Sequence, residues 1–104
     1  MKRFTVRVSP DAQEQILEQV FYIARDSVDN ALAWEVRVRA AMNSIGDAPG
    51  HAVDEDASRR AGETIREFVF ERTYLIHYRV DEQASLVDIV NFRHGARLPR
   101  IGEP

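Results

Sequence analysis

The C-terminal third of this chain contains the stretch Tyr74-Leu75-Ile76-His77-Tyr78-Arg79-Val80, which indicates a β-strand. Apolar and polar side chains alternate along most of it, which is the period of a β-strand with one buried face. Tyr74, Ile76, Tyr78 and Val80 share one side and are expected to face the core, whereas Leu75, His77 and Arg79 share the other. Such a strand requires a second layer of structure against its apolar side.

Further strand-forming runs flank this stretch on both sides. They are Glu63–Phe70 and Leu86–Phe92, separated from it by the short polar breaks at residues 71–73 and 81–83. The three runs are therefore predicted to form two consecutive hairpins. A fourth strand is expected at Phe4–Val8, where apolar and polar residues also alternate.

Between the first strand and the hairpins, apolar residues recur with the period of amphipathic helices. Ser9-Pro10-Asp11 predicts a helix start with Ser9 as the N-cap, and this helix should run to about Asp26. A second helix is expected from Ser27 or Asp29 to Ile45, ended by Gly46. The expected core residues are Ala12, Ile16, Leu17, Val20, Phe21, Ile23 and Ala24 in the first helix, and Ala31, Trp34, Val38, Ala41, Met42 and Ile45 in the second.

These elements predict an α+β fold with the order β-α-α-β-β-β, in which a helical hairpin packs on one face of a curved, mainly antiparallel four-stranded sheet. The segment from Asp47 to Gly62 is expected to be a loop, because Gly, Pro, Asp, Ser and Ala dominate it. A chain of 104 residues is the size of one domain, here residues 1–104. The sheet face without helices, which carries His77 and Arg79, is then a candidate binding surface.

Composition narrows the classes of function. The chain contains no cysteine, which excludes disulfides and thiolate metal sites and suits a reducing cytoplasm. The sequence shows neither a signal peptide nor the roughly 20 apolar residues of a membrane helix, so we expect a cytoplasmic protein without membrane contact. The three histidines have no partner at helical spacing and no glycine-rich phosphate loop is present, so neither a metal site nor a cofactor is expected.

Charge is distributed unevenly along the chain. The net charge is −3, yet residues 89–102 contain Arg93, Arg97 and Arg100 and no carboxylate. Lys2 is the sole lysine, so the basic character is almost wholly arginine, which makes forked contacts with carboxylates and phosphates. The C-terminal stretch is therefore a candidate basic contact surface.

The order of elements and a set of short motifs resemble the RelE/ParE superfamily, the toxins of type II toxin–antitoxin systems. The motifs are Ser9-Pro10-Asp11-Ala12, Ala48-Pro49-Gly50, Ile65-Arg66-Glu67-Phe68, the stretch from Tyr74 to Val80, and Ile89-Val90-Asn91-Phe92-Arg93-His94-Gly95-Ala96-Arg97. The resemblance spans nearly the whole chain. It implies a cognate antitoxin that binds and silences the protein, with oligomerisation through the antitoxin complex.

Two branches of that superfamily imply different targets. ParE-like members poison DNA gyrase, and the spacing from Arg66 to Tyr78 together with the ending His94-Gly95-Ala96-Arg97 is more similar to that branch. RelE-like members cut messenger RNA on the ribosome, and similarity to them would make Arg66, Arg93 and His94 catalytic. A third alternative is an inactive member that only binds its antitoxin. The residues expected to contact an antitoxin or a target are Arg66, His77, Arg79, Arg93, Arg97 and Arg100.

Overall fold

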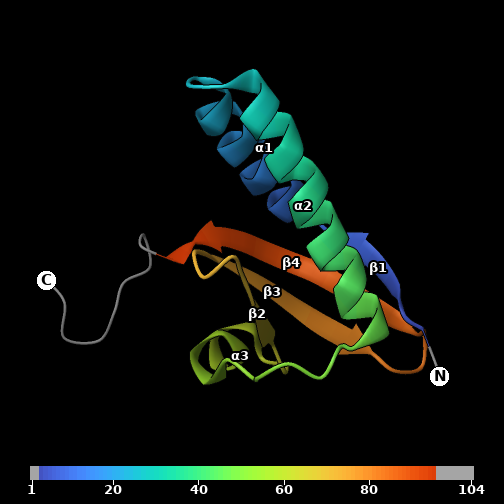
Figure 1. Cartoon of the computed structure of the whole chain (residues 1–104). Helices are drawn as coiled ribbons and strands as arrows, with labels where there is room; N and C mark the ends of the chain where they lie inside the picture. Colours follow the sequence, from blue (N-terminus) through green and yellow to red (C-terminus); the bar gives the residue numbers. More distant parts are fainter. Residues whose placement is uncertain (1–2, 96–104) are drawn as a thin grey trace, which may run out of the picture.

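The computed structural model describes residues 3–95. They form a four-stranded sheet with a helical hairpin on one face and a short helix on the other (Figure 1). The elements are β1 (Thr5–Val8), α1 (Pro10–Ala24), α2 (Val28–Asp47), α3 (Glu55–Ala61), β2 (Arg66–Phe70), β3 (Tyr74–Asp81) and β4 (Leu86–His94). The four strands are ordered β1-β4-β3-β2, with β1 parallel to β4 and the other pairs antiparallel. The predicted α+β fold is confirmed, with α3 as an addition.

Both long helices begin where the sequence supplies a cap. The Ser9 hydroxyl accepts a hydrogen bond from the Ala12 N–H at 3.1 Å, and Pro10 occupies the first helical position. The Ser27 hydroxyl accepts one from the Asn30 N–H at 3.1 Å, so Ser27 rather than Asp29 caps α2. Among residues 3–95, no helix is long and apolar enough to cross a bilayer.

One hydrophobic core lies between the helical hairpin and the sheet. The Trp34 ring packs edge-on against Phe70, Tyr74 and Phe92, with ring centroids 5.3 to 6.1 Å away. The predicted core residues Ile16, Trp34 and Tyr78 are buried there together with Ile89, and the predicted Val20 packs against them partly buried. The expected inward face of β3 is thus confirmed.

The predicted core stripe of α1 was too wide. Leu17 and Phe21 are 37% and 69% exposed, because α1 turns Ile16 and Gln19 towards the sheet. Successive residues of a helix are about 100° apart, so a residue next to the contact line points sideways or outwards. The buried Gln19 is accommodated by a hydrogen bond from its side-chain amide to the Tyr74 hydroxyl at 3.0 Å.

The segment predicted to be a loop contains α3 and lies along β2. The Asp54 carboxylate caps α3 by accepting from the Ala57 N–H at 3.0 Å, and Gly62 ends the helix in the left-handed conformation, with φ 72°. Backbone hydrogen bonds from Asp54 N to Ile65 O and from Glu67 N to Ala52 O hold the approach to α3 against the sheet. Part of the sheet face expected to be open is therefore covered.

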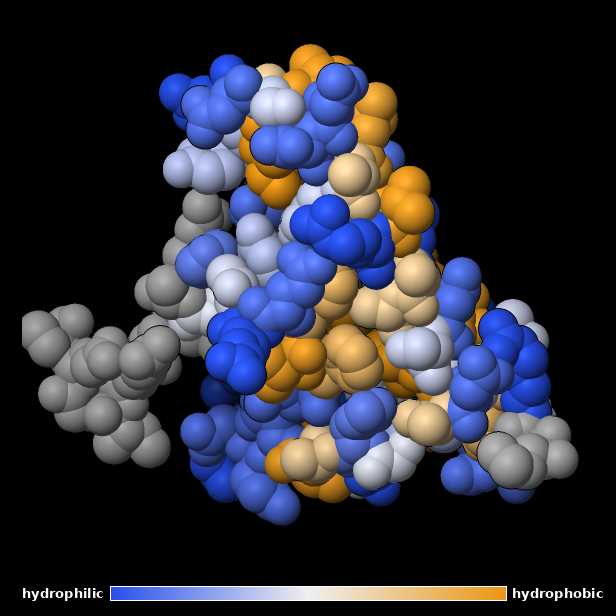
Figure 2. Space-filling view, in the orientation of Figure 1, coloured by the Kyte–Doolittle hydropathy of each residue, from blue (hydrophilic) through white to orange (hydrophobic). Residues whose placement is uncertain are grey.

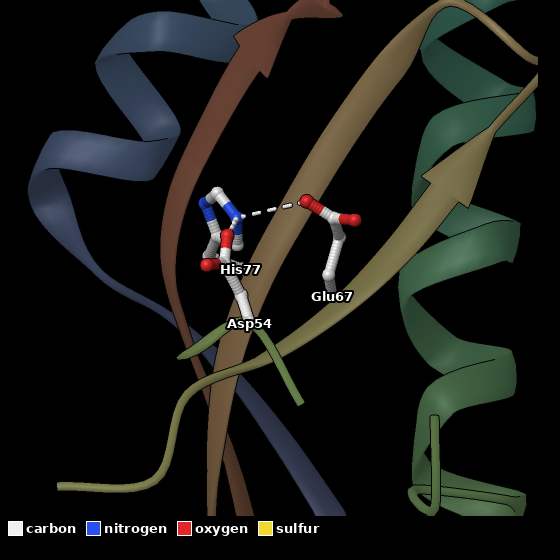
Figure 3. Close-up of side chains that lie close together, drawn as sticks. All are labelled: Asp54, Glu67 and His77. Atoms are coloured by element: carbon white, nitrogen blue, oxygen red, sulfur yellow. Dashed lines mark hydrogen bonds and ion pairs between the residues drawn. The ribbon is translucent and has the colours of Figure 1, made fainter. Parts of the chain in front are cut away.

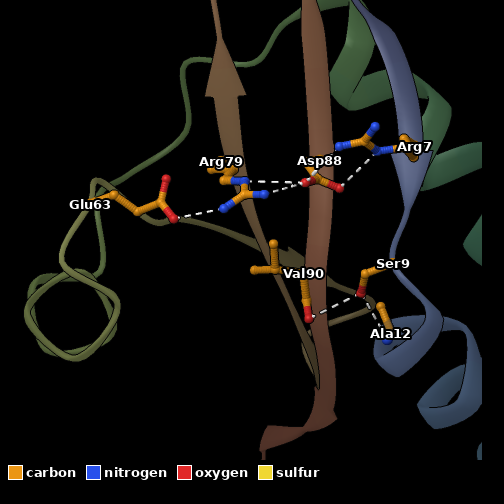
Figure 4. Close-up of polar contacts among 7 residues, drawn as sticks. All are labelled: Arg7, Ser9, Ala12, Glu63, Arg79, Asp88 and Val90. Atoms are coloured by element: carbon orange, nitrogen blue, oxygen red, sulfur yellow. Dashed lines mark hydrogen bonds and ion pairs between the residues drawn. The ribbon is translucent and has the colours of Figure 1, made fainter.

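On that outer face a charged cluster joins three strands through Asp88 of β4 (Figure 4). One carboxylate oxygen of Asp88 accepts from Arg7 of β1 at 3.2 Å and from Arg79 of β3 at 2.8 Å. Arg79 also pairs with Glu63 at 2.7 Å. Burial opposes the charge on Asp88, but the hydrogen bonds from Arg7 and Arg79 outweigh it and hold the pKa of this carboxyl below its usual value.

The C-terminal turn of α2 contacts the start of the sheet at Gly46. The Phe4 N–H donates to the Gly46 carbonyl at 2.9 Å, and a Cβ on Gly46 would lie 2.6 Å from the Phe4 carbonyl oxygen and 2.9 Å from a methyl group of Val6. Gly46 was expected to end the helix, but α2 continues to Asp47. Glycine at this position permits a close backbone approach.

We expect Gly46→Ala to destabilise the fold by about 1–3 kcal/mol, because the added methyl group forces β1 away from α2. Alanine is otherwise favoured over glycine in a helix by about 1 kcal/mol, so the sign of the change distinguishes crowding from helix propensity. Chemical denaturation measures it. Gly50→Ala is the matched control, since nothing lies within 4 Å of a Cβ there, and an equal loss in both variants would contradict the steric account.

We expect Asp88→Asn to lower the free energy of unfolding by about 1–3 kcal/mol at neutral pH, because two guanidinium groups lose their anion. A carboxyl whose pKa is lowered by folding stabilises the fold above its unfolded pKa of about 3.9, and that contribution is lost as pH falls through the folded pKa. The difference between wild type and variant should therefore shrink below about pH 4. Denaturation at several pH values measures it. Asp26→Asn, at an exposed position in the hairpin turn, should leave the profile unchanged.

Candidate functional site

The sheet register divides the predicted site residues between its two faces. Arg66 pairs with Tyr78 and His94 pairs with Tyr74, so both lie on the face that carries the hairpin. His77, Arg79 and Arg93 belong to the opposite face, where Leu75 is the register partner of Arg93. Arg97 and Arg100 lie outside the described residues.

Arg66 is hydrogen-bonded to the segment that follows α2, residues 49–51. Its guanidinium donates to the His51 carbonyl at 2.7 Å, and the neighbouring Tyr78 hydroxyl donates to the Pro49 carbonyl at 2.6 Å. Burial raises the pKa of Tyr78, while the His51 N–H and the charge of Arg66 act in the opposite direction. These bonds fasten residues 49–51 to the sheet, so Arg66 has a structural partner.

Arg93 and His94 lie at the end of β4, beyond the point where β1 stops pairing with it. There the Gln15 side chain of α1 replaces a strand partner by accepting from the Phe92 N–H at 2.7 Å. Arg93 and His94 line a surface cavity of about 300 Å³ together with Gln15, Glu18, Gln19, Tyr22 and Phe92. The His94 ring packs edge-on against Tyr74, with centroids 5.2 Å apart.

Of the three residues considered as a catalytic set, Arg93 and His94 line the same cavity, but Arg66 lies apart from them. Arg66 lies beside Tyr78 and His94 beside Tyr74. Tyr74 and Tyr78 are four positions apart on β3, which corresponds to on the order of 13 Å at about 3.3 Å per residue. Arg93 belongs to the other face of the sheet. The sheet therefore does not gather Arg66, Arg93 and His94 around one reacting group.

His77 was expected on an open surface, and the structure corrects this. Its side chain is only 7% exposed, because α3 and the residues before it cover this part of the sheet. The ring nitrogen Nε2 lies 3.1 Å from an Asp54 carboxylate oxygen and 3.3 Å from a Glu67 carboxylate oxygen (Figure 3). The Ala57 N–H is the main cause that holds the pKa of Asp54 below its usual value, and His77 adds to it against partial burial.

Asp54 and Glu67 were not singled out from the sequence. Glu67 could have been found, because the hairpin from β2 to β3 places it directly opposite His77. Asp54 gives no such signal, since its position depends on α3. One ligand atom from each of Asp54, Glu67 and His77 lies within 4.8 Å of the others, so these residues form a group that could hold a metal ion.

The helical hairpin exposes apolar side chains that the core does not use. On α2 they recur every fourth residue, at Val28, Leu32 and Val36, which are 61%, 55% and 69% exposed. On α1 the exposed apolar residues are Leu17, Phe21 and Tyr22. Figure 2 shows apolar side chains gathered along the hairpin, away from the sheet. This surface is a candidate for contact with another protein.

Comparison with known proteins places these features in a family. No curated protein matches this chain. A family model described as the ParE toxin of the type II toxin–antitoxin system parDE matches residues 6–99, a range that contains α1 to α3 and β2 to β4 in full. The partner implied by this family is an antitoxin. The chain therefore belongs to the ParE toxin family and is the toxin of a type II toxin–antitoxin system.

Proposed function

We propose that this toxin inhibits DNA gyrase by protein–protein contact and is neutralised by a cognate antitoxin. The observation that carries the proposal is the match to the ParE family over residues 6–99. The similarity of the His94-Gly95-Ala96-Arg97 ending to the ParE-like branch agrees with it. No chemical step is required of the toxin under this proposal.

The arrangement of the candidate catalytic residues favours this proposal over messenger RNA cleavage. Cleavage through the 2′-hydroxyl needs a proton acceptor, a proton donor and cationic groups around one phosphate. Arg93 and His94 line one cavity at the end of β4, but Arg66 on β2 pairs with Tyr78, four positions along β3 from Tyr74, the partner of His94. Arg66 also donates to the His51 carbonyl, which gives it a role in the fold.

The antitoxin is proposed to lie on the exposed apolar side of the hairpin. A stripe at every fourth residue of α2 suits an amphipathic segment that orders on binding. Contact through arginine on the outer face is less favoured, because Arg7 and Arg79 already pair with Asp88 of the same chain. An antitoxin that covers the apolar stripe could also join several toxin chains, which agrees with the expected oligomerisation through the antitoxin complex.

The target can be tested with His94→Gln and Arg66→Lys, since cleavage and gyrase binding make different demands on these residues. We expect both variants to inhibit the supercoiling of relaxed plasmid DNA by purified gyrase to within about threefold of the wild type, because neither change removes an interaction that binding requires. Ribosome-bound messenger RNA should remain intact when either protein is induced. Thermal unfolding of each variant controls for loss of fold.

A different pattern would favour the nuclease. Message cleavage by the wild type that falls by about 100-fold in His94→Gln, with gyrase unaffected, would replace the gyrase proposal with general acid–base catalysis. Absence of both activities in a folded, antitoxin-binding protein would favour an inactive member.

The proposed antitoxin surface can be tested with the double variant Leu32→Ser and Val36→Ser. We expect the dissociation constant for the antitoxin encoded beside this toxin to rise by about 10-fold or more, because two apolar contacts are lost. Calorimetric titration measures it. Val69→Ser is the matched control, since Val69 is 53% exposed on β2, away from the hairpin. Equal weakening by the control, or none in the double variant, would place the antitoxin elsewhere.

A further inference from the structure

Two carboxylates and one ring nitrogen converge under α3. Nε2 of the buried His77 ring lies between an oxygen of Asp54 and an oxygen of Glu67, at 3.1 and 3.3 Å (Figure 3). The three side chains come from the N-cap of α3, from β2 and from β3. If Nε2 carries no hydrogen, its lone pair and the two carboxylates repel one another at these distances unless a cation lies between them.

The other ring nitrogen of His77 is committed to a hydrogen bond. The Asn91 amide is best satisfied with its oxygen towards the Arg93 guanidinium, at 2.9 and 3.0 Å, and its nitrogen towards the Gln15 side-chain oxygen. In that orientation its oxygen also accepts from His77 Nδ1 at 3.2 Å. The hydrogen of a neutral ring is then on Nδ1, which leaves the lone pair of Nε2 directed at the two carboxylates.

We propose that Asp54, Glu67 and His77 bind a divalent transition-metal ion of the zinc type. Two zinc ligands at about 2.0–2.1 Å and the tetrahedral angle are about 3.3–3.4 Å apart, which is close to the separations of Nε2 from both carboxylate oxygens. An imidazole and two carboxylates are ligands that Zn²⁺ accepts. The hydrogen bond from Nδ1 to Asn91 is the kind of outer contact that orients a ligating histidine.

The surroundings leave room for a further ligand from solvent. The side chains of Asp54 and Glu67 are 24% and 30% exposed, so water can complete a fourth position. An ion here would join the start of α3 to β2 and β3, and binding would favour the folded state over the unfolded one. The site is independent of the proposed antitoxin surface, since it uses none of the exposed apolar residues of the helical hairpin.

The proposal is tested by titrating the full-length, untagged toxin with ZnCl₂ in a calorimeter and with CoCl₂ in an absorption spectrometer. We expect one ion per chain, a rise in melting temperature with ZnCl₂, and visible Co²⁺ bands of low coordination number. His77→Gln and Glu67→Gln should each weaken Zn²⁺ binding by about 100-fold or more, which exceeds the 10- to 100-fold effect of an outer contact. Asn91→Ala should weaken it by about 10- to 100-fold.

Matched controls separate this site from general affinity for cations. His51→Gln should bind Zn²⁺ as the wild type does, because the His51 ring packs on Phe68 and Tyr78 of the opposite sheet face. Glu63→Gln should also retain binding, since Glu63 pairs with Arg79. If His77→Gln unfolds, Glu67→Gln decides the matter. Absence of saturable binding by the wild type, or equal binding by Glu67→Gln, would overturn the proposal and assign the positive charge to a proton on His77.

Discussion

A helical hairpin can bury only one face of a sheet, and this geometric limit divides the protein into an apolar side and a polar side. The hairpin α1–α2 takes the face formed by residues such as Tyr78 and Ile89, and a single aromatic cluster around Trp34 fills the space between the layers. The side chains on the other face cannot be buried by the helical hairpin and need other partners. There the side chains are mainly polar, and they are held by mutual ion pairs and by the short helix α3.

Two polar clusters on the outer face illustrate how the sheet accommodates buried charge. Asp88 is 6% exposed and is held between Arg7 and Arg79, so its burial is offset by two guanidinium groups. The buried side chain of His77 faces two carboxylates instead. The Asp88 cluster contains its own counterions. In the His77 cluster, a proton or a metal ion is needed between the ring nitrogen and the carboxylates. That difference is why the second cluster, and not the first, carries a proposed ligand.

The sequence was sufficient for the elements whose signals are local or periodic. The alternation from Tyr74 to Val80 gave the inward face of β3, and Ser9-Pro10 gave the start of α1. The sequence was insufficient where contacts between distant parts of the chain determine whether an element forms or what a residue does. Seven residues without a large apolar side chain gave no sign of α3, whose cap at Asp54 is fastened to Ile65 by a backbone bond. Likewise, Gly46 looked like a helix end, although its role depends on the approach of Phe4.

For the candidate binding residues, the type of residue did not indicate whether its side chain is free to contact a partner protein. Arginines were expected to meet an acidic partner, yet Arg79 pairs with Glu63 and Asp88, and Arg66 binds a backbone carbonyl. Phe21 was expected in the core, yet it is 69% exposed on the helical hairpin, and Val36, which was not assigned to the core, is equally exposed. An isolated toxin thus presents to solvent the kind of surface that a partner covers, while much of its charge is satisfied internally. Recognition of the antitoxin is therefore proposed to depend on the shape and spacing of apolar groups more than on net charge.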